Sequence, residues 1–101
     1  MELLIFLFRS GLQREEGLTI SAKRAEKYRQ VKGLLQKLYV MDNSTGHVGA
    51  VFIFDSKENL EAFRNSDLAK STSEAYKFLE PPTARVLEVF KVLYEDKERV
   101  I

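Results

Sequence analysis

Two short apolar segments limit what this chain can fold into more than any other feature. Residues 3–8 and 48–54 carry apolar side chains or glycine at every position, rather than at alternate positions. An uninterrupted run of this length is typical of a β-strand that is covered on both faces. The first run is too short to span a bilayer, and Arg9 ends it too early for a signal peptide. We therefore expect two strands at the centre of a sheet.

The segments around these runs predict a β-α-β-β-α-β order. Residues 10–18 contain two glycines and are expected to form a loop, whereas Gly46 and the Pro81-Pro82 pair mark a hairpin and a helix end. The expected strands lie at residues 2–9, 34–42, 47–55 and 84–95. The expected helices lie at residues 20–32, 57–65 and 67–78. This order predicts a single ferredoxin-like α+β domain over residues 1–101, with an antiparallel four-stranded sheet and its helices on one face.

The apolar pattern also predicts a partner subunit. A sheet with helices on one face exposes its other face, so its strands should alternate between apolar and polar residues. The central strands do not alternate, whereas Gln36, Lys37 and Arg85 interrupt the edge strands. An apolar centre with a polar rim is typical of an interface, and we expect a homodimer through sheet-to-sheet packing. The alternative is that loops or the charged tail at residues 95–101 cover the second face.

Composition removes several classes of function. The 101 residues include 16 Lys and Arg against 15 Asp and Glu, so no strong field favours nucleic acid or a membrane surface. With no cysteine and one histidine, neither a disulfide, a thiol nucleophile nor a metal site is expected. The basic cluster at residues 23–29 is typical of a solvated helix face. We expect a soluble, cytoplasmic domain.

A family resemblance rests on an ordered set of segments. Residues 33–39 read Gly-Leu-Leu-Gln-Lys-Leu-Tyr, residues 49–55 read Gly-Ala-Val-Phe-Ile-Phe-Asp, Ala62-Phe63 follows, and residues 79–90 form the closing segment. This set resembles the dimeric α+β barrel superfamily, in the branch of small monooxygenases akin to the antibiotic-biosynthesis monooxygenases. It covers about residues 33–95.

The sequence also departs from the family pattern. Gln36 stands where the family has an aromatic residue, Tyr39 where it has Trp, and Ala50 where it has the second glycine. Haem-degrading members of the superfamily use a helix-borne His, which this chain lacks because its single histidine, His47, adjoins the expected hairpin. The resemblance therefore implies no haem degradation.

The resemblance implies oxygenation of a small aromatic or quinol-type compound without a cofactor. Such a reaction needs a group that favours the substrate anion and a dry apolar pocket. Lys37 and Tyr39 are the candidate catalytic residues, with no metal and no cofactor. The candidate pocket residues are Tyr28, Phe52, Phe63 and Tyr76.

Each candidate residue also has a purely structural interpretation. Lys37 suits an exposed lysine that protects an edge strand from aggregation. The tyrosines suit core residues whose hydroxyl groups reach the boundary, and His47 suits an exposed turn. The alternative functions are therefore a non-enzymatic module that binds a small apolar or aromatic ligand, and a structural dimerisation module.

Overall fold

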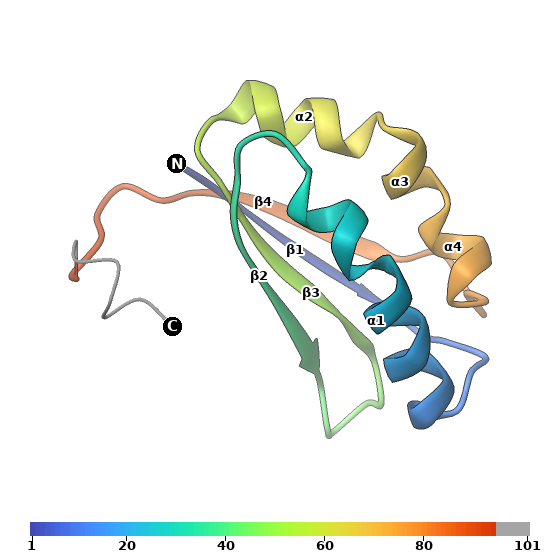
Figure 1. The fold of residues 1–101 in the computed structure, drawn as a ribbon. Helices are drawn as coiled ribbons and strands as arrows, with labels where there is room; N and C mark the ends of the chain where they lie inside the picture. The colour runs from blue at the N-terminus through green and yellow to red at the C-terminus, as the bar shows by residue number, and fades with distance from the viewer. Residues whose placement is uncertain (95–101) are drawn as a thin grey trace.

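The chain forms one antiparallel sheet with strand order β2-β3-β1-β4 (Figure 1). The computed structural model describes residues 1–94, so the predicted tail at 95–101 lies outside the described residues. The strands are β1 (Glu2–Phe8), β2 (Leu34–Met41), β3 (Val48–Phe54) and β4 (Thr83–Glu88). The helices are α1 (Arg14–Arg29), α2 (Lys57–Arg64), α3 (Asp67–Lys70) and α4 (Thr72–Ala75). The element order and the strand order confirm the predicted ferredoxin-like α+β fold.

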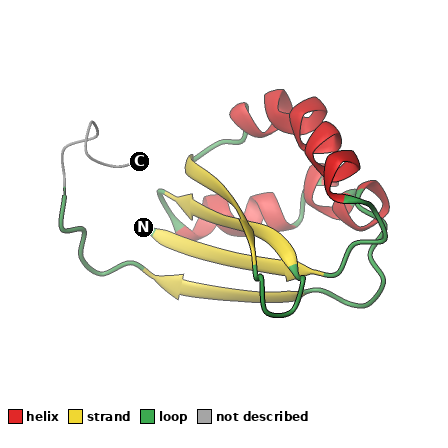
Figure 2. Ribbon diagram, turned by 90° about the horizontal axis from the view of Figure 1, so that it is seen from below, coloured by secondary structure: helices red, strands yellow, loops and turns green. Residues whose placement is uncertain are grey.

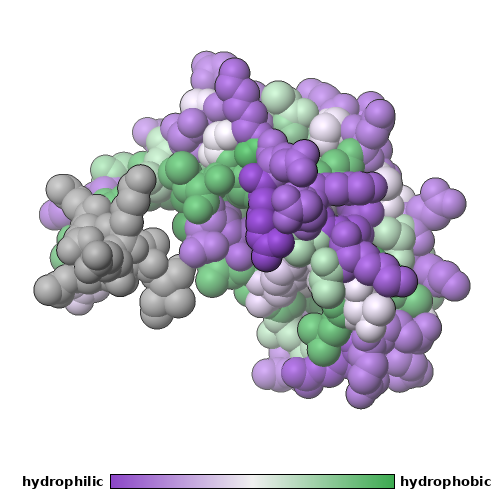
Figure 3. Space-filling view, in the orientation of Figure 1, coloured by the Kyte–Doolittle hydropathy of each residue, from purple (hydrophilic) through white to green (hydrophobic). Residues whose placement is uncertain are grey.

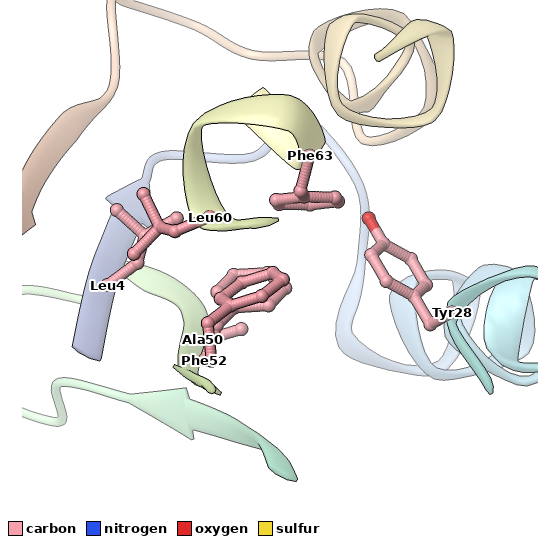
Figure 4. Packing of buried hydrophobic residues seen from close by; sticks show 7 residues of the cluster. Leu4, Tyr28, Ala50, Phe52, Leu60 and Phe63 are labelled. Carbon is pink, nitrogen blue, oxygen red and sulfur yellow. The ribbon is translucent and has the colours of Figure 1, made fainter. Parts of the chain in front are cut away.

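The helices lie together on one side of the sheet (Figure 2). On β1 and β3, the residues that face the helices carry even numbers, a choice that the sequence left open because both parities are apolar. Leu4 on β1 and Phe52 on β3 are almost fully buried there, and Leu60 and Phe63 of α2 pack onto them. Figure 4 shows both α2 side chains pointing toward the sheet, while Tyr28 approaches from α1. The core therefore lies mainly beneath α2.

The opposite face of the sheet is apolar as well. Leu3 and Ile5 on β1 pair with Ile53 and Val51 on β3, and all four side chains are half-buried within the single chain. On the edge strand β2, Leu38 lies opposite Val51 and remains exposed. No element of residues 1–94 is seen to cover this face in Figure 2.

A β-bulge sets the orientation of strand β2. Leu34 lies opposite Phe54, but the next paired residue is Gln36, opposite Ile53, so Leu35 is the extra residue. A bulge of one residue reverses which side chains face each side of a sheet. Beyond the bulge, Lys37 lies opposite Phe52 and Tyr39 opposite Ala50, on the face that the helices cover.

Helix α1 begins earlier than predicted. It starts at Arg14 rather than near residue 20, and it ends at Arg29 rather than at residue 32. The backbone N–H of Gln13 donates a 2.9 Å hydrogen bond to the Glu16 carboxylate, which satisfies one donor at the helix start. Gly17 lies inside the helix, so its tolerance of non-helical conformations was a misleading loop signal.

The predicted helix at residues 67–78 is two separate turns, α3 and α4, joined at Ser71. The Ser66 hydroxyl caps α3 by accepting a hydrogen bond from the backbone N–H of Ala69. The backbone of Lys77 has a φ of +52°, a left-handed conformation that ends helical structure after α4.

Strand β4 ends earlier than the predicted 84–95, because its partner strand β1 begins at Glu2 and offers no residue for β4 to pair with beyond that point. Glu88 pairs with Glu2 at the start of β1, and the Val89 N–H bonds to the Met1 carbonyl at 2.9 Å. The following residues lead away from the sheet (Figure 1), and Phe90 is 92% exposed. Within residues 1–94, the helices are all too short or too polar to cross a membrane.

Candidate functional site

A cavity of about 760 Å³ lies between helix α1 and the sheet. Leu4, Phe6 and Phe8 of β1 line it, together with Ala50 and Phe52 of β3. Strand β2, the helices and nearby loop residues provide the remaining walls. The face of the molecule in Figure 3 is mainly hydrophilic, with hydrophobic side chains visible between the hydrophilic ones. The cavity walls are mostly apolar, as suits a site that binds an apolar or aromatic molecule. The structure places all six predicted site residues around this cavity, namely Tyr28, Lys37, Tyr39, Phe52, Phe63 and Tyr76.

The Lys37 amine lies among aromatic rings. Its Nζ atom is 3.1 Å from the centre of the Tyr28 ring, 4.5 Å from that of Tyr39 and 5.1 Å from that of Phe52. None of the ion pairs within residues 1–94 includes Lys37. Burial and, to a lesser extent, the nearby Arg24 charge lower the pKa of Lys37 to about 7. At neutral pH this amine therefore exists in both protonation states, so it can accept a proton or stabilise an anion.

Arg24 connects helix α1 to the α3–α4 segment. Its guanidinium donates hydrogen bonds to the Leu68 carbonyl at 3.0 Å and to the Ser71 hydroxyl at 3.1 Å, and a longer one to the Tyr28 hydroxyl at 3.4 Å. Its Nε atom is buried and has no hydrogen-bond partner among residues 1–94. These contacts hold the Tyr28 ring beneath the Lys37 amine and bring a second positive charge close to it.

This role of Arg24 was not predicted from the sequence, because the basic cluster at residues 23–29 indicated a solvated helix face. The signal was its spacing: Arg24 precedes Tyr28 by four residues, which places both on the same face of α1. In the structure Lys23 and Lys27 are exposed, whereas Arg24 is half-buried.

Tyr39 and Tyr76 border the cavity at other points. Burial is the main cause that raises the pKa of Tyr39 above its ordinary value, and Tyr76 adds to the shift. The Tyr39 hydroxyl therefore stays protonated at neutral pH, where it can donate a hydrogen bond to a ligand. The Tyr76 hydroxyl is 2.7 Å from that of Ser21, and this contact joins α4 to α1.

His47 is not among the residues that line the cavity. Its Nδ1 atom is 2.8 Å from the Thr45 hydroxyl, and its Nε2 atom is 3.4 Å from the Glu80 carboxylate. It thus lies beside the hairpin, near the start of β4. In the part of the chain that the structure describes, no three residues of the types His, Cys, Asp or Glu come together as metal ligands.

Solved structures with the same fold span nearly the whole chain. A monooxygenase from the gene ActVA-Orf6 of Streptomyces coelicolor, in complex with nanaomycin D, has a TM-score of 0.70 at 14% identity, covering 94% of this chain and 92% of its own. A protein described as an antibiotic biosynthesis monooxygenase has a TM-score of 0.68 at 13% identity, covering 90% and 100%. A dimeric ferredoxin-like protein of unknown function from Thermobifida fusca has a TM-score of 0.67 at 12% identity, covering 87% and 90%.

No protein-family model matches the sequence, and no curated protein matches it. At the identities of the solved structures, the likeness establishes the fold alone. The chain therefore has the ferredoxin-like fold that antibiotic-biosynthesis-monooxygenase structures share.

Proposed function

We propose that this protein is a cofactor-independent, monooxygenase-like enzyme that acts on a small aromatic or quinol-type compound. The observation that carries this proposal is the position of the Lys37 amine, which faces aromatic rings in a mostly apolar cavity without a carboxylate partner among the described residues. An amine with a pKa of about 7 is suited to general-base catalysis at neutral pH.

The reaction begins with removal of a proton from a phenol, or from the enol form of an anthrone, by neutral Lys37. The resulting anion is electron-rich enough to donate electrons to O₂. For an anthrone, the methylene carbon gains a carbonyl oxygen and the balance is R₂CH₂ + O₂ → R₂C=O + H₂O. The Tyr39 hydroxyl donates a hydrogen bond to the substrate oxygen, and the apolar walls protect the reactive intermediate from water.

Three further observations support this proposal. The cavity lies between the helices and the sheet, where the residues predicted for the site meet. The S. coelicolor monooxygenase, which shares this fold, was solved in complex with the ligand nanaomycin D. A helix–sheet layer filled by phenylalanine side chains would have favoured a purely structural module, and the cavity is instead large enough for a drug-sized molecule.

The test is O₂ consumption with a panel of hydroquinones and anthrones. We expect one or more of these compounds to raise O₂ uptake above the buffer rate, and we expect Lys37→Met to lower kcat by about 10²–10⁴-fold, the usual contribution of a general base. Tyr39→Phe should have a smaller effect. Lys23→Met, which removes an exposed lysine from α1, is the matched control and should leave the rate unchanged. Equal rates in Lys37→Met and the control would contradict the role of Lys37.

The second candidate function is a non-enzymatic module that binds a small aromatic ligand, and the same cavity favours it. The two candidates differ only in turnover. Measurable binding of several panel compounds, with no O₂ uptake above the buffer rate for any of them, would support the binding module and contradict the enzyme.

We also infer that the protein forms a homodimer by packing the outer faces of two sheets together. The half-buried apolar side chains of Leu3, Ile5, Val51 and Ile53 support this inference, because a monomer would expose them as one patch. The T. fusca protein of the same fold is dimeric. Light scattering at micromolar concentration should give twice the 11.7 kDa chain mass.

A charge on the outer face should break this dimer. Val51→Lys places an amine at the centre of that face, opposite Ile5 and Leu38, and should yield monomers. Leu18→Lys is the matched control, because Leu18 is 60% exposed on α1. A stable wild-type monomer would rule out the dimer.

A further inference from the structure

Lys37 lies in an environment that the other lysines do not share. Within residues 1–94, every other lysine is exposed, whereas Lys37 is half-buried and lines the apolar cavity. Lys70 also lines the cavity, but it is exposed. Among the described residues, the cavity lining includes no aspartate, glutamate, histidine or cysteine. Its serine, threonine and tyrosine hydroxyls therefore have no carboxylate or imidazole in the lining to activate them, and the inner amine of Lys37 is the nucleophile best placed to react there.

The neighbours of the Lys37 amine are aromatic rings rather than carboxylates. Its Nζ atom is 3.1 Å from the centre of the Tyr28 ring and 4.5 Å from that of Tyr39, and none of the ion pairs of residues 1–94 includes it. Burial and the Arg24 charge lower its pKa to about 7. Since only the neutral form of a lysine attacks a carbonyl carbon, Lys37 is reactive at a pH at which an ordinary lysine is almost entirely protonated.

We propose that Lys37 has a second activity, as a nucleophile: it condenses reversibly with aromatic aldehydes that enter the cavity and binds them as imines. The Lys37 nitrogen attacks the carbonyl carbon, and the carbonyl oxygen takes up a proton to give a carbinolamine. The C–O bond then breaks, and the oxygen leaves as water with the two protons of the amine. The balance is R–CHO + H₂N–R′ → R–CH=N–R′ + H₂O, where R′ is the lysine side chain. This activity goes beyond the proposed oxygenation, because it uses no O₂ and changes no oxidation state.

The cavity favours the imine of an aromatic aldehyde in three ways. Its volume of about 760 Å³ accommodates a compound of two fused rings, and apolar walls that include Phe52 and Phe63 bury such a ring system. The same walls limit the access of water, which would hydrolyse the imine. When the imine is protonated, its charge lies where the ammonium group would lie, close to the face of the Tyr28 ring.

The test traps the imine in the full chain with sodium cyanoborohydride, which reduces it to a stable secondary amine. The protein is incubated with 2-naphthaldehyde at pH 7 without O₂, and peptide mass mapping gives the initial rate of labelling at each lysine. We expect Lys37 to react at least about tenfold faster than any exposed lysine, Lys70 included. Its larger neutral fraction favours it by about a thousandfold over an ordinary lysine, and the lower nucleophilicity of a less basic group, as known for thiols, offsets part of this advantage.

A second aldehyde separates the effect of the cavity from that of the amine. Glyceraldehyde has no ring to bury, so its preference for Lys37 over the exposed lysines should be several-fold smaller than that of 2-naphthaldehyde. In urea-unfolded protein, the preference of 2-naphthaldehyde for Lys37 should disappear, because both the cavity and the neutral amine depend on the fold.

Two pairs of variants locate the reaction. Lys37→Met should lose the fast-reacting site, whereas Lys23→Met, which removes an exposed lysine outside the cavity lining, should keep it. Ala25→Leu enlarges a side chain of the cavity wall while keeping the amine, and should lower the 2-naphthaldehyde preference to about that of glyceraldehyde. Ala84→Leu makes the same change at an exposed position of β4 outside the lining and should preserve the preference. Circular dichroism checks that the variants remain folded.

Labelling of Lys37 no faster than that of the exposed lysines in the folded wild-type protein would overturn the proposal. The same preference for Lys37 with both aldehydes would also overturn it, because the cavity would then have no part in selecting an aromatic compound. A preference that survives unfolding in urea would do so as well. These outcomes are distinct from failure of the oxygenase proposal, which is measured by O₂ uptake with hydroquinones and anthrones and involves no aldehyde.

Discussion

Helices α1 and α2 cover the same face of one sheet, but they are held there by different interactions. In α2, two of eight residues are buried, Leu60 completely and Phe63 to 6% exposure. In α1, Tyr28 is the single buried residue among sixteen. Polar contacts join α1 to its neighbours instead, through Ser21 and Arg24. The comparison shows that apolar burial stabilises one half of the helix–sheet layer, while the other half keeps a cavity and is fastened by hydrogen bonds at its edge.

The largest expected effect tests the packed half. Leu60→Ala removes a fully buried side chain and should lower the free energy of unfolding by about 2–5 kcal/mol, because the surrounding core cannot collapse to fill the space. Leu18→Ala makes the same change in α1 at a 60% exposed position and should cost less than about 0.5 kcal/mol. Urea denaturation measures both. Similar losses would mean that the two helices are packed alike.

The next effect tests the polar attachment of α1. Arg24→Gln removes the charged hydrogen bonds to Leu68 and Ser71 and should cost about 1.5–3 kcal/mol of unfolding free energy. Amide exchange in α1 should accelerate more than exchange in α2, since α1 depends on these contacts. Lys23→Gln, a neighbouring exposed position, provides the control. Uniform acceleration across both helices would instead indicate loss of global stability.

Replacing Lys37, unlike the two changes above, should raise the free energy of unfolding. Its pKa of about 7 in the fold lies below the ordinary 10.5, so the unfolded chain binds more protons between these pH values and stability rises with pH across that window. Below pH 7 the cost of burying the charge is fully present. Lys37→Met should therefore stabilise the protein at pH 6.5 by on the order of 1–2 kcal/mol, after allowance for partial solvent screening.

The measurement for Lys37 is urea denaturation of wild type and Lys37→Met at pH 6.5 and pH 9.5. The difference between the two proteins should shrink at the higher pH, while other titrating groups cancel in the subtraction. A pH-independent difference would show that the Lys37 pKa is not lowered in the fold.

The smallest effect concerns the link between α1 and α4. Ser21→Ala removes the partner of the Tyr76 hydroxyl at 2.7 Å and should cost about 0.5–1.5 kcal/mol. Tyr76→Phe should cost a similar amount, and the double variant should cost little more than either single change. Additive losses in this double-mutant cycle would show that the two hydroxyls do not interact.

The arrangement of strands was accessible from the sequence because apolar runs and turn residues act locally. The central position of residues 3–8 followed from their double-sided apolar pattern, and Gly46 adopts the positive φ that the hairpin needs. The start of α1 was not accessible in this way. Gln13 is not a favoured N-cap residue, and Gly17 suggested a loop although it lies within the helix.

The candidate site residues were chosen by type and resemblance, and the structure brings them to one cavity. The resemblance implied an apolar pocket, but the residue pattern could not give its size, because that depends on how the contacts of α1 hold it over the sheet rather than on which residues α1 contains. The position of Arg24 between Tyr28 and Ser71 is a tertiary contact over 47 residues, for which no local pattern exists. The end of β4 likewise depends on where β1 begins.

The bulge at Leu35 has a consequence for how this site could arise or vanish. In an unbroken ladder starting from the Leu34–Phe54 pair, Gln36 would face the helices and Lys37 the outer face of the sheet. One extra residue, itself 54% exposed and not part of the cavity lining, determines which face of the sheet receives the amine. The chemistry of the cavity thus depends on a count of residues as much as on their identity, because deleting the single codon for Leu35 would turn Lys37 and Tyr39 to the outer face while the cavity residues of β1 and β3 keep their positions.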